Sequence, residues 1–356
     1  MSDKRREVEE LRQEMGKIDT QLLAALEKRG KLSKRIGDLR KDVPAAVTMP
    51  DRTQLEGLLG RATGDIPKPA LSEIFREIWA TCLSLEQPTM VSYCGLEGAF
   101  AHAAARSRFG HAAQYTACET VSAALDEVTR QRAQYAVVPY ETRTDGLMQM
   151  TIAALTTSDL KIIACFETVV NLQVLTKAGS MEEIEKVYAI AKDRAHCQRF
   201  LAEKLPGAQV MDVKTPMGAC QLAADDPRAA ALAHASVGAS HGLEIICRNV
   251  RDEGDERVRY AIVGTRPSSR SGNDLTAVVF AVNDSPGALH EVLKQFAERG
   301  VNLTKIQSRP TQEEAWQYLF FIEVQGHPTD RNVVGAIEEV RRQSKFFKVL
   351  GSYQAT

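Results

Sequence analysis

Residues 5–41 carry the hydrophobic pattern of one long helix, with apolar side chains at heptad spacing and no Pro to interrupt them. Such a helix would reach about 55 Å, far more than a small domain needs, so we expect a second chain to pack along it. Position 29 of the apolar seam is Arg29, and Arg12 and Arg40 lie beside the same face. The seam consists of Val8, Leu11, Met15, Ile18, Leu22, Ala25, Leu32, Ile36 and Leu39. Two more helices are predicted, over 51–61 and 69–86.

From about residue 90 to 265, short apolar runs alternate with helical stretches. Strands are expected in MVSYCG, QYAVVPYE, KVYAIA, AQVMDV and AAALA, with two more in KIIACFETVVNLQVLT. Helices are expected in AHAAARSRFG, RAHCQRFLAEKL and PMGACQLAA. This alternation predicts an α/β region with mostly parallel sheets, long enough for two lobes around a ligand-binding cleft.

A polar segment rich in Ser and Gly, RPSSRSGND, separates this region from the rest of the chain. After it, strand, helix, strand, strand, helix and strand patterns follow in order. This βαββαβ order predicts an α+β, ferredoxin-like module. The chain is therefore expected to be multidomain, with modules at 1–88, 89–266 and 274–356.

The composition and charge of the chain argue against several classes of function. The 356 residues are 44% hydrophobic and 26% charged, as in globular proteins. With 45 basic and 46 acidic residues, the net charge of -1 gives no field that would attract nucleic acid or an anionic membrane. The N-terminus lacks the apolar core of a signal peptide, and the seven scattered cysteines form no CxxC pair. We expect a cytoplasmic protein with reduced thiols, without a metal site or cofactor.

The first module resembles the all-helical chorismate mutases, through LRQEMGKIDTQLLAALEKRGKLSKRIGDLR. The resemblance implies an intertwined homodimer or a tetramer. It also implies a pericyclic reaction, for which the enzyme must bind the two carboxylates of its substrate and needs no nucleophile. Guanidinium groups bind carboxylates bidentately. By resemblance, Arg12, Arg29 and Arg52 hold carboxylates, and Arg40 stands where the family commonly has a Lys that meets the ether oxygen.

Two positions of this helical site affect its expected chemistry: Glu86 is one of two residue types that the family uses there, and Thr53 departs from the family pattern. Glu86 stands where the family has Gln or Glu, and as Glu it must be protonated to donate to the ether oxygen. The family usually continues Arg-Glu in the second helix, and here the pair is Arg52-Thr53. Thr53 can donate one hydrogen bond but is shorter and uncharged.

The middle module resembles the prephenate dehydratases in length and in the order of its motifs, which implies a two-lobed, periplasmic-binding-protein-like α/β fold. YCGLEGAFAHAAA is similar to Gly-Pro-Glu-Gly-Thr-Phe-Ser, and VVPYETRTDG to Val-Val-Pro-x-Glu-Asn-Ser-x-x-Gly. VYAIAKDRAHCQRFL is similar to the Tyr-Ser-His-Pro-Gln segment, KTPMGA to Ser-Thr-x-x-Ala, and ERVRYAIVG to Asn-x-Thr-Arg-Phe. The resemblance implies dehydration and decarboxylation of prephenate to phenylpyruvate.

Several polar positions of those motifs hold other residues here. The dehydratase must protonate a leaving hydroxyl as the carboxylate departs. The Thr most closely tied to that step is replaced by Val258, and Ile190 and Ala99 also stand at polar family positions. Candidate site residues are Glu141, Thr142, Thr215, Val258 and Arg259, with Glu97 also retained.

Three alternatives remain open for this lobe. It could be a dehydratase that uses a different donor, such as Thr142, Thr215 or Glu141. It could carry out another reaction on prephenate, such as decarboxylation. It could also be a non-catalytic lobe of an amino-acid-sensing paralogue.

The last module resembles the ACT domains, which are small βαββαβ regulators that bind amino acids. DSPGALHEVL matches the family's Gly-Ala-Leu turn, and VNLTKIQSRP matches the segment that closes over phenylalanine, with Gln307 in place of Glu. A Gly at a helix N-terminus lets a carboxylate approach the backbone closely. The effector-binding residues implied are Gly287, Ala288, Leu289, Asn302, Leu303, Gln307, Ser308 and Arg309. Together the three resemblances predict a shikimate-pathway enzyme for L-phenylalanine biosynthesis, with chorismate and prephenate as substrates and phenylalanine as effector.

Overall fold

The computed structural model describes residues 2–40, 52–143, 146–254, 256–283, 285–310 and 318–355. The chain divides into two compact units. One contains the residues up to Met90 together with Arg106–Gln114, and the other contains Val91–Ala105 and Tyr115–Thr356. Among the described helices, none combines the length and apolar character needed to span a bilayer.

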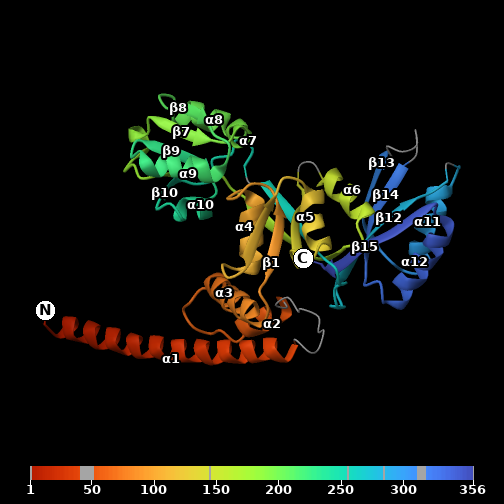
Figure 1. Cartoon of the computed structure of the whole chain (residues 1–356), viewed down its shortest axis with the longest axis horizontal. Helices are drawn as coiled ribbons and strands as arrows, with labels where there is room; N and C mark the ends of the chain where they lie inside the picture. Colours follow the sequence, from red (N-terminus) through yellow and green to blue (C-terminus); the bar gives the residue numbers. More distant parts are fainter. Residues whose placement is uncertain are drawn as a thin grey trace. The chain divides into compact units, whose positions relative to one another are not determined.

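The first unit is helical, as the sequence predicts (Figure 1). Its helices are α1 (Ser2–Arg40), α2 (Arg52–Leu59) and α3 (Lys68–Glu86). Helix α1 approaches the end of α3 through small residues, because a Cβ on Gly37 would lie 2.2 Å from the Glu86 carbonyl oxygen. Ser33 is buried one turn earlier, and Gly30 lies against Leu85. Close backbone approach at this face therefore fixes how α1 and α3 cross.

The second unit contains a ten-stranded sheet in the order β13-β14-β12-β15-β5-β11-β3-β1-β2, with the short β4 beside β3. Its strands are β1 (Met90–Cys94), β2 (Gln114–Cys118), β3 (Tyr135–Thr142), β4 (Gly146–Leu147), β5 (Lys161–Val170), β11 (Glu256–Gly264), β12 (Asp274–Ala281), β13 (Leu303–Pro310), β14 (Tyr318–Gln325) and β15 (Phe346–Gln354). The accompanying helices are α4 (Phe100–Phe109), α5 (Val121–Thr129), α6 (Gln149–Thr157), α11 (Ala288–Ala297) and α12 (Arg331–Gln343). The predicted α/β and βαββαβ modules thus share one sheet, which the sequence did not predict.

The two halves of this sheet meet where β15 runs beside β5, with Gly351 opposite Ile162. Gly351 has φ of 154°, a conformation that L side chains rarely adopt. A Cβ at this position would lie 2.1 Å from the Ile162 carbonyl oxygen. The absence of a side chain therefore allows the two strands to join.

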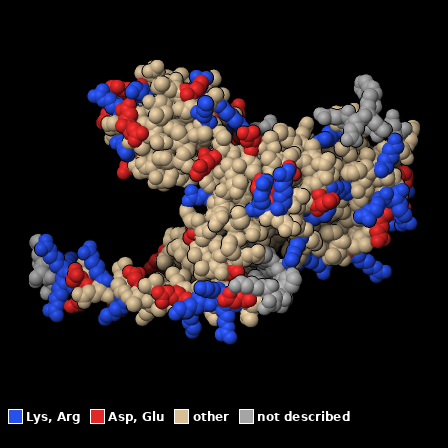
Figure 2. Space-filling model, viewed as in Figure 1, with Lys and Arg blue, Asp and Glu red and all other residues tan. Residues whose placement is uncertain are grey.

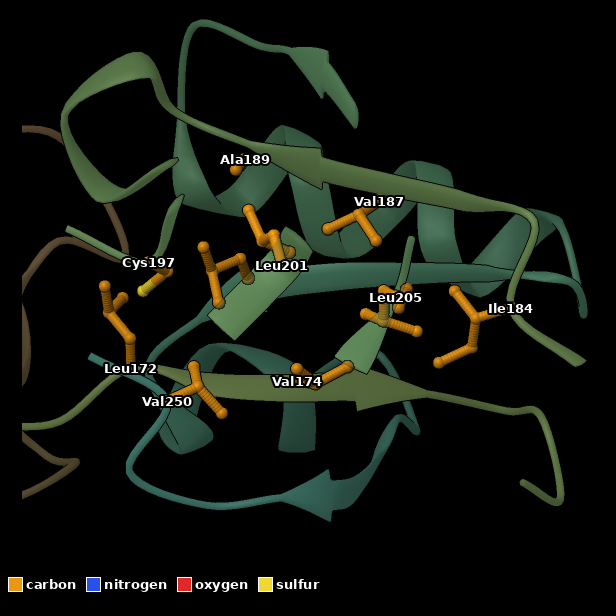
Figure 3. Packing of buried hydrophobic residues seen from close by; sticks show 11 residues of the cluster. Leu172, Val174, Ile184, Val187, Ala189, Cys197, Leu201, Leu205 and Val250 are labelled. Carbon is orange, nitrogen blue, oxygen red and sulfur yellow. The ribbon is translucent and has the colours of Figure 1, made fainter. Parts of the chain in front are cut away.

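A second sheet, in the order β10-β6-β9-β7-β8, forms the other lobe of the α/β region. Its strands are β6 (Gln173–Thr176), β7 (Lys186–Ala189), β8 (Gln209–Asp212), β9 (Ala229–Ala233) and β10 (Glu244–Cys247), and its helices are η1 (Met181–Glu183), α7 (Ala191–Ala195), α8 (Gln198–Lys204), α9 (Pro216–Asp225) and α10 (Ala235–Ala239). Figure 3 shows Val174 and Val187 of the sheet gathered with Leu201 of α8 in a buried apolar cluster. This core places the N-termini of α7 and α9 directly after the parallel strands β7 and β8.

Two secondary-structure predictions need correction. The sheets are mixed, since β3 and β5 both run antiparallel to β11, and parallel pairing is confined mainly to β1–β3 and β8–β7–β9. The helix expected through RAHCQRFLAEKL is broken into α7 and α8, because the backbone of Cys197 leaves the helical conformation after His196. The expected βαββαβ order of the last module is confirmed by β12, α11, β13, β14, α12 and β15.

The junction glycine gives a direct test of the shared sheet. Gly351→Ala should lower the free energy of unfolding by about 2–4 kcal/mol, because the new methyl group collides with backbone and φ becomes strained. Gly207→Ala, at a site with open space around it, should stay within about 0.5 kcal/mol of the unmodified chain. Urea unfolding followed by circular dichroism measures both, and equal stability of the two variants would show that the junction is not constrained.

Candidate functional site

The helical unit buries one end of a guanidinium group without a partner. Arg29 is half-buried, and its Nη1 is shielded from solvent with no hydrogen-bond partner in the described part of the chain. An unsatisfied buried donor is costly, and it costs more when charged. A carboxylate bound beside α1 would supply the missing acceptor.

Of the other residues predicted for this site, the structure describes the side chains of Glu86 and Arg12. Glu86 is half-buried at the end of α3, with its backbone against Gly37. Arg12 is exposed on the same helix as Arg29 and lies about 25 Å from it along the axis. One chain therefore cannot bring both guanidinium groups to a single small molecule. The side chains of Arg40, Arg52 and Thr53 lie outside the described residues.

In the α/β region, the loop after β1 lies against the helix N-termini of the other lobe. A Cβ on Gly98 would lie 3.2 Å from Val237 and 3.6 Å from the Met217 backbone nitrogen. The ring centroid of Phe100 lies 6.0 Å from that of His234. Helix N-termini carry unpaired N–H groups and a positive dipole end, which suit an anionic ligand. The two lobes thus meet at Glu97–Phe100, in the first predicted motif.

Thr215 lies on the second lobe, at the start of α9. Its Oγ1 accepts a hydrogen bond from the Gly218 backbone N–H at 3.0 Å, which caps the helix. The Thr215 hydroxyl hydrogen remains available to an acceptor, since capping uses only the oxygen lone pair. No contact between Thr215 and Glu141 is found among the described residues, so the structure does not join these two predicted site residues directly.

On the first lobe, Val258 lies at the centre of three paired strands. It is opposite Thr142 on β3 and Thr168 on β5, and it is 7% exposed. The hydroxyl expected at this position by resemblance is therefore absent from a buried site, although two threonines flank it. Thr142 is half-buried at the end of β3.

Arg259, the next residue, projects into a cluster of charges. Its Nη1 lies 3.4 Å from Glu141 Oε2 and 3.4 Å from Glu323 Oε1. Lys305 pairs with Oε1 of the same Glu141, and its Nζ lies 3.8 Å from Glu323 Oε2. We call Arg259, Lys305, Glu141 and Glu323 the interdomain charge cluster. Its two cations balance its two anions, which lowers the cost of burying them.

Two tyrosines complete the shell around Glu323, which is 2% exposed. The hydroxyls of Tyr140, at 2.9 Å, and of Tyr353 donate to Glu323 Oε1. The Arg259 guanidinium lies over both rings, 5.6 Å and 5.1 Å from their centroids. Burial raises the pKa of both tyrosines well above the ordinary value, so they remain hydrogen-bond donors. Burial alone would lower the pKa of Arg259, but nearby Tyr353, Cys165 and Glu323 raise it.

A local irregularity lets two consecutive residues reach this cluster. The register between β3 and β11 shifts between Arg259 and Tyr260, so Tyr140 has no partner opposite it. A bulge of this kind turns neighbouring side chains toward one side. Tyr140 and Glu141 therefore both contact the interdomain charge cluster.

Sequence reasoning identified Glu141 and Arg259 but missed Lys305, Glu323, Tyr140 and Tyr353. One signal was present, since Glu323 interrupts the apolar run YLFFIEVQ on a strand that is otherwise suited to a core. A carboxylate in such a run requires partners. The partners come from strands far apart in sequence, which the pattern could not identify.

In the C-terminal module, the predicted turn has the expected backbone. Gly287 has φ of 83° and precedes α11, which begins at Ala288. Leu289 packs against the core of this module, and the Asn302 carbonyl accepts from the Gln325 N–H at 2.9 Å. Gln307 lies opposite Phe321 in the pairing of β13 with β14. The Arg309 guanidinium donates to the Gln149 carbonyl at 3.2 Å, outside this module.

One further carboxyl near the lobe junction has an altered acidity. Asp193 is buried in α7, and this burial raises its pKa to about 6 despite the nearby Lys192 and Arg251. Within the described ranges, no group of three or more His, Cys, Asp or Glu side chains is arranged to hold a metal ion.

Comparison with protein families matches the three modules in order. The chorismate mutase type II model matches residues 11–87, the prephenate dehydratase model residues 91–268, and the ACT domain model residues 276–342. A "Bifunctional chorismate mutase/prephenate dehydratase" from Aquifex aeolicus is 38% identical over 353 residues, which is 98% of each chain.

Solved structures resemble the part of the chain after the helices. Prephenate dehydratase from Arthrobacter aurescens, solved in complex with L-Phe, is 30% identical with a TM-score of 0.62 and covers 75% of this chain and 90% of its own. A structure described as a quorum quenching acylase, GqqA, is 25% identical with a TM-score of 0.64 and covers 75% of this chain and 98% of its own.

The acidity of Asp193 predicts a pH-dependent stability difference. Its folded pKa, near 6, exceeds the unfolded value of 3.8, so ionisation opposes folding as pH rises through this window. Asp193→Asn should therefore raise the free energy of unfolding by about 1–3 kcal/mol at pH 7.5 and change it little at pH 3.5. The exposed Asp225→Asn serves as the control in urea unfolding at both pH values. A gain that is equal at both pH values would contradict the assignment.

Proposed function

This chain belongs to the family of bifunctional chorismate mutase/prephenate dehydratases, and on that premise we propose that it converts chorismate to prephenate and prephenate to phenylpyruvate, under feedback by phenylalanine. The observation that carries this proposal is the end-to-end likeness to a relative named for both reactions. We assign the first reaction to residues 1–88, the second to 89–266 and the feedback to 274–356.

The helical module needs to hold a dianion in a compact conformation, because its reaction is a rearrangement without nucleophile or base. Arg29 is suited to this role, since its buried Nη1 lacks an acceptor in the described structure. Glu86 lies at the end of α3, beside α1, where a protonated carboxyl would donate to the ether oxygen. Arg40, Arg52 and Thr53 complete the proposed site.

A second copy of the chain is required to complete this arrangement. The large apolar residues of the α1 seam are 40–66% exposed, which is unusual for a long row of aliphatic side chains on a monomer. Figure 2 shows basic and acidic side chains interspersed along α1 on the face in view, as on the outer faces of paired helices. An antiparallel partner helix would cover the apolar seam and bring its Arg12 toward Arg29. We therefore propose a homodimer, or a tetramer built from it.

The second reaction removes carbon dioxide and hydroxide from prephenate, so one proton must reach the departing hydroxyl. The proposed donor is a hydroxyl of Thr142 or Thr215, or the Glu141 carboxyl, because Val258 has none to give. The remaining carboxylate would be held by Arg259 and by the N-terminus of α9. Phenylalanine, the end product, would bind the C-terminal module at Gly287, Ala288, Leu289, Asn302, Leu303, Gln307, Ser308 and Arg309.

The lack of a hydroxyl at buried Val258 favours a second candidate for this lobe. Departure of carbon dioxide without loss of the hydroxyl leaves the bonding electron pair on the ring, so the proton goes to a ring carbon and no donor to the hydroxyl is needed at Val258. The alternative reaction is therefore decarboxylation of prephenate to a product that retains the hydroxyl group.

Product analysis tests the two reactions separately. Purified protein given chorismate should consume it and form prephenate and phenylpyruvate, each followed by chromatography. Arg29→Ala should lower kcat/KM for chorismate by about 100-fold or more, since a charge-assisted contact to the substrate is lost. Arg6→Ala, which removes an exposed cation of the same helix, should leave the rate unchanged. Undiminished chorismate consumption in Arg29→Ala would remove the helical anion site.

Restoring the hydroxyl tests the second lobe. Val258→Thr should raise the rate of phenylpyruvate formation by about 10-fold or more, because a positioned donor contributes a factor of this order or larger to proton transfer. Val258→Ala, which removes volume without adding a hydroxyl, is the matched control and should not raise the rate. A wild-type product that retains the hydroxyl group would instead identify the decarboxylation alternative.

A further inference from the structure

Strand β13 presents one face to the dehydratase region. From Lys305 onward, half-buried residues alternate with exposed ones, so that Lys305, Gln307 and Arg309 share the inner face. Leu303 lies before a register shift and packs against the core under the helices instead. Helices α11 and α12 cover the opposite face of the C-terminal sheet, where Ile322 and Val324 join the core. Glu323, between these two residues, therefore points away from the helices.

Two basic side chains on this face of β13, Lys305 and Arg309, contact the dehydratase region. The Lys305 ammonium pairs with the Glu141 carboxylate on β3. The Arg309 guanidinium donates to the Gln149 carbonyl at the start of α6, at 3.2 Å. These two anchors flank Gln307, which is one of the residues assigned to effector binding. Each is two residues from Gln307, or about 7 Å along the strand.

We propose that Lys305 is a positioning residue through which effector occupancy of β13 controls the dehydratase site. This inference rests on the proposed function of the second lobe and of the C-terminal module. Glu141 is shared, since one carboxylate oxygen pairs with Lys305 and the other faces Arg259 Nη1 at 3.4 Å. A small displacement of β13 would therefore change how firmly Glu141 holds the Arg259 guanidinium.

The balance of charges in the interdomain charge cluster depends on the position of the Lys305 ammonium. With Lys305 in place, the interdomain charge cluster has two cations and two anions. Withdrawal of the ammonium leaves two carboxylates around one guanidinium, of which Glu323 is almost fully buried. Arg259 would then be drawn more strongly to those carboxylates and away from a substrate carboxylate. Its Nε is buried without an acceptor in the described residues, so the side chain has an unused donor for either arrangement.

The test removes the ammonium and keeps most of the length of the side chain. Because the ammonium is then absent permanently, Lys305→Met should lower phenylpyruvate formation without phenylalanine. It should also raise the phenylalanine concentration for half-inhibition of the remaining activity at least 10-fold. Phenylalanine affinity by calorimetry should stay within threefold, and chorismate consumption should be unchanged. Lys305→Arg, which keeps the charge, should retain inhibition. Lys294→Met, on the exposed side of α11, is the matched control and should behave as wild type. Unaltered inhibition in Lys305→Met would overturn the proposal.

A second readout does not depend on turnover. Phenylalanine should change amide hydrogen exchange in residues 135–143 of the wild-type chain, and Lys305→Met should abolish this change while still binding phenylalanine. If the wild type forms no phenylpyruvate but shows this exchange response, the proposed dehydratase reaction fails while the coupling stands. If Lys305→Met does not fold, Glu141→Gln breaks the same pair from the other side and should abolish the exchange response. A response that persists in the variant used, or is absent from the wild type, would overturn the coupling.

Discussion

The buried carboxylate of Glu323 constrains how the two modules of the second unit pack together. A carboxylate that is almost fully shielded from water needs cations and hydrogen-bond donors around it, and each of these must be held in place. Here Arg259 and Tyr140 come from the dehydratase region, whereas Lys305 and Tyr353 come from the C-terminal module. Separation of the two modules would therefore break the contacts of Glu323 with both Arg259 and Tyr140.

The shared sheet supports the same junction at the level of the backbone. Gly351 permits β15 to approach β5, and the bulge at Tyr140 turns two consecutive residues toward Glu323. The result places a strand with predicted effector-binding residues and a strand with predicted catalytic residues around one set of charges. In such an arrangement, regulation would require no long pathway, because Glu141 contacts both Lys305 of β13 and Arg259 of β11.

The helical unit differs from the second unit, because a single chain neither covers its apolar seam nor completes its proposed site. The seam of α1 is exposed, and Arg29 has a buried nitrogen without an acceptor in the described structure. Association with a second copy would cover the apolar seam, and binding of a dianion would supply an acceptor for Arg29. The chemistry proposed for this unit thus depends on assembly, whereas that of the dehydratase lobe depends on an interdomain contact.

Much of the fold could be predicted from local pattern. The heptad spacing identified α1, and the order of strands and helices identified the βαββαβ module, because both depend on nearby residues. Glu141 and Arg259 were identified by motif, and the structure brings them together. The role of Glu323 and Lys305 could not be predicted, since β3, β11, β13 and β14 are brought together only by tertiary folding. The break at His196 and Cys197 was missed for a related reason, because buried Cys197 packs into a core that the local sequence does not reveal.

A double-mutant cycle on Lys305→Met and Glu141→Gln tests the central claim most directly. Free energies of unfolding in urea would be measured for the wild type, the two single variants and the double variant, with and without phenylalanine. Coupling of at least about 1 kcal/mol without phenylalanine, and a different coupling with it, is the result expected for a partly buried ion pair that responds to the effector. Strictly additive effects in both conditions would contradict the account.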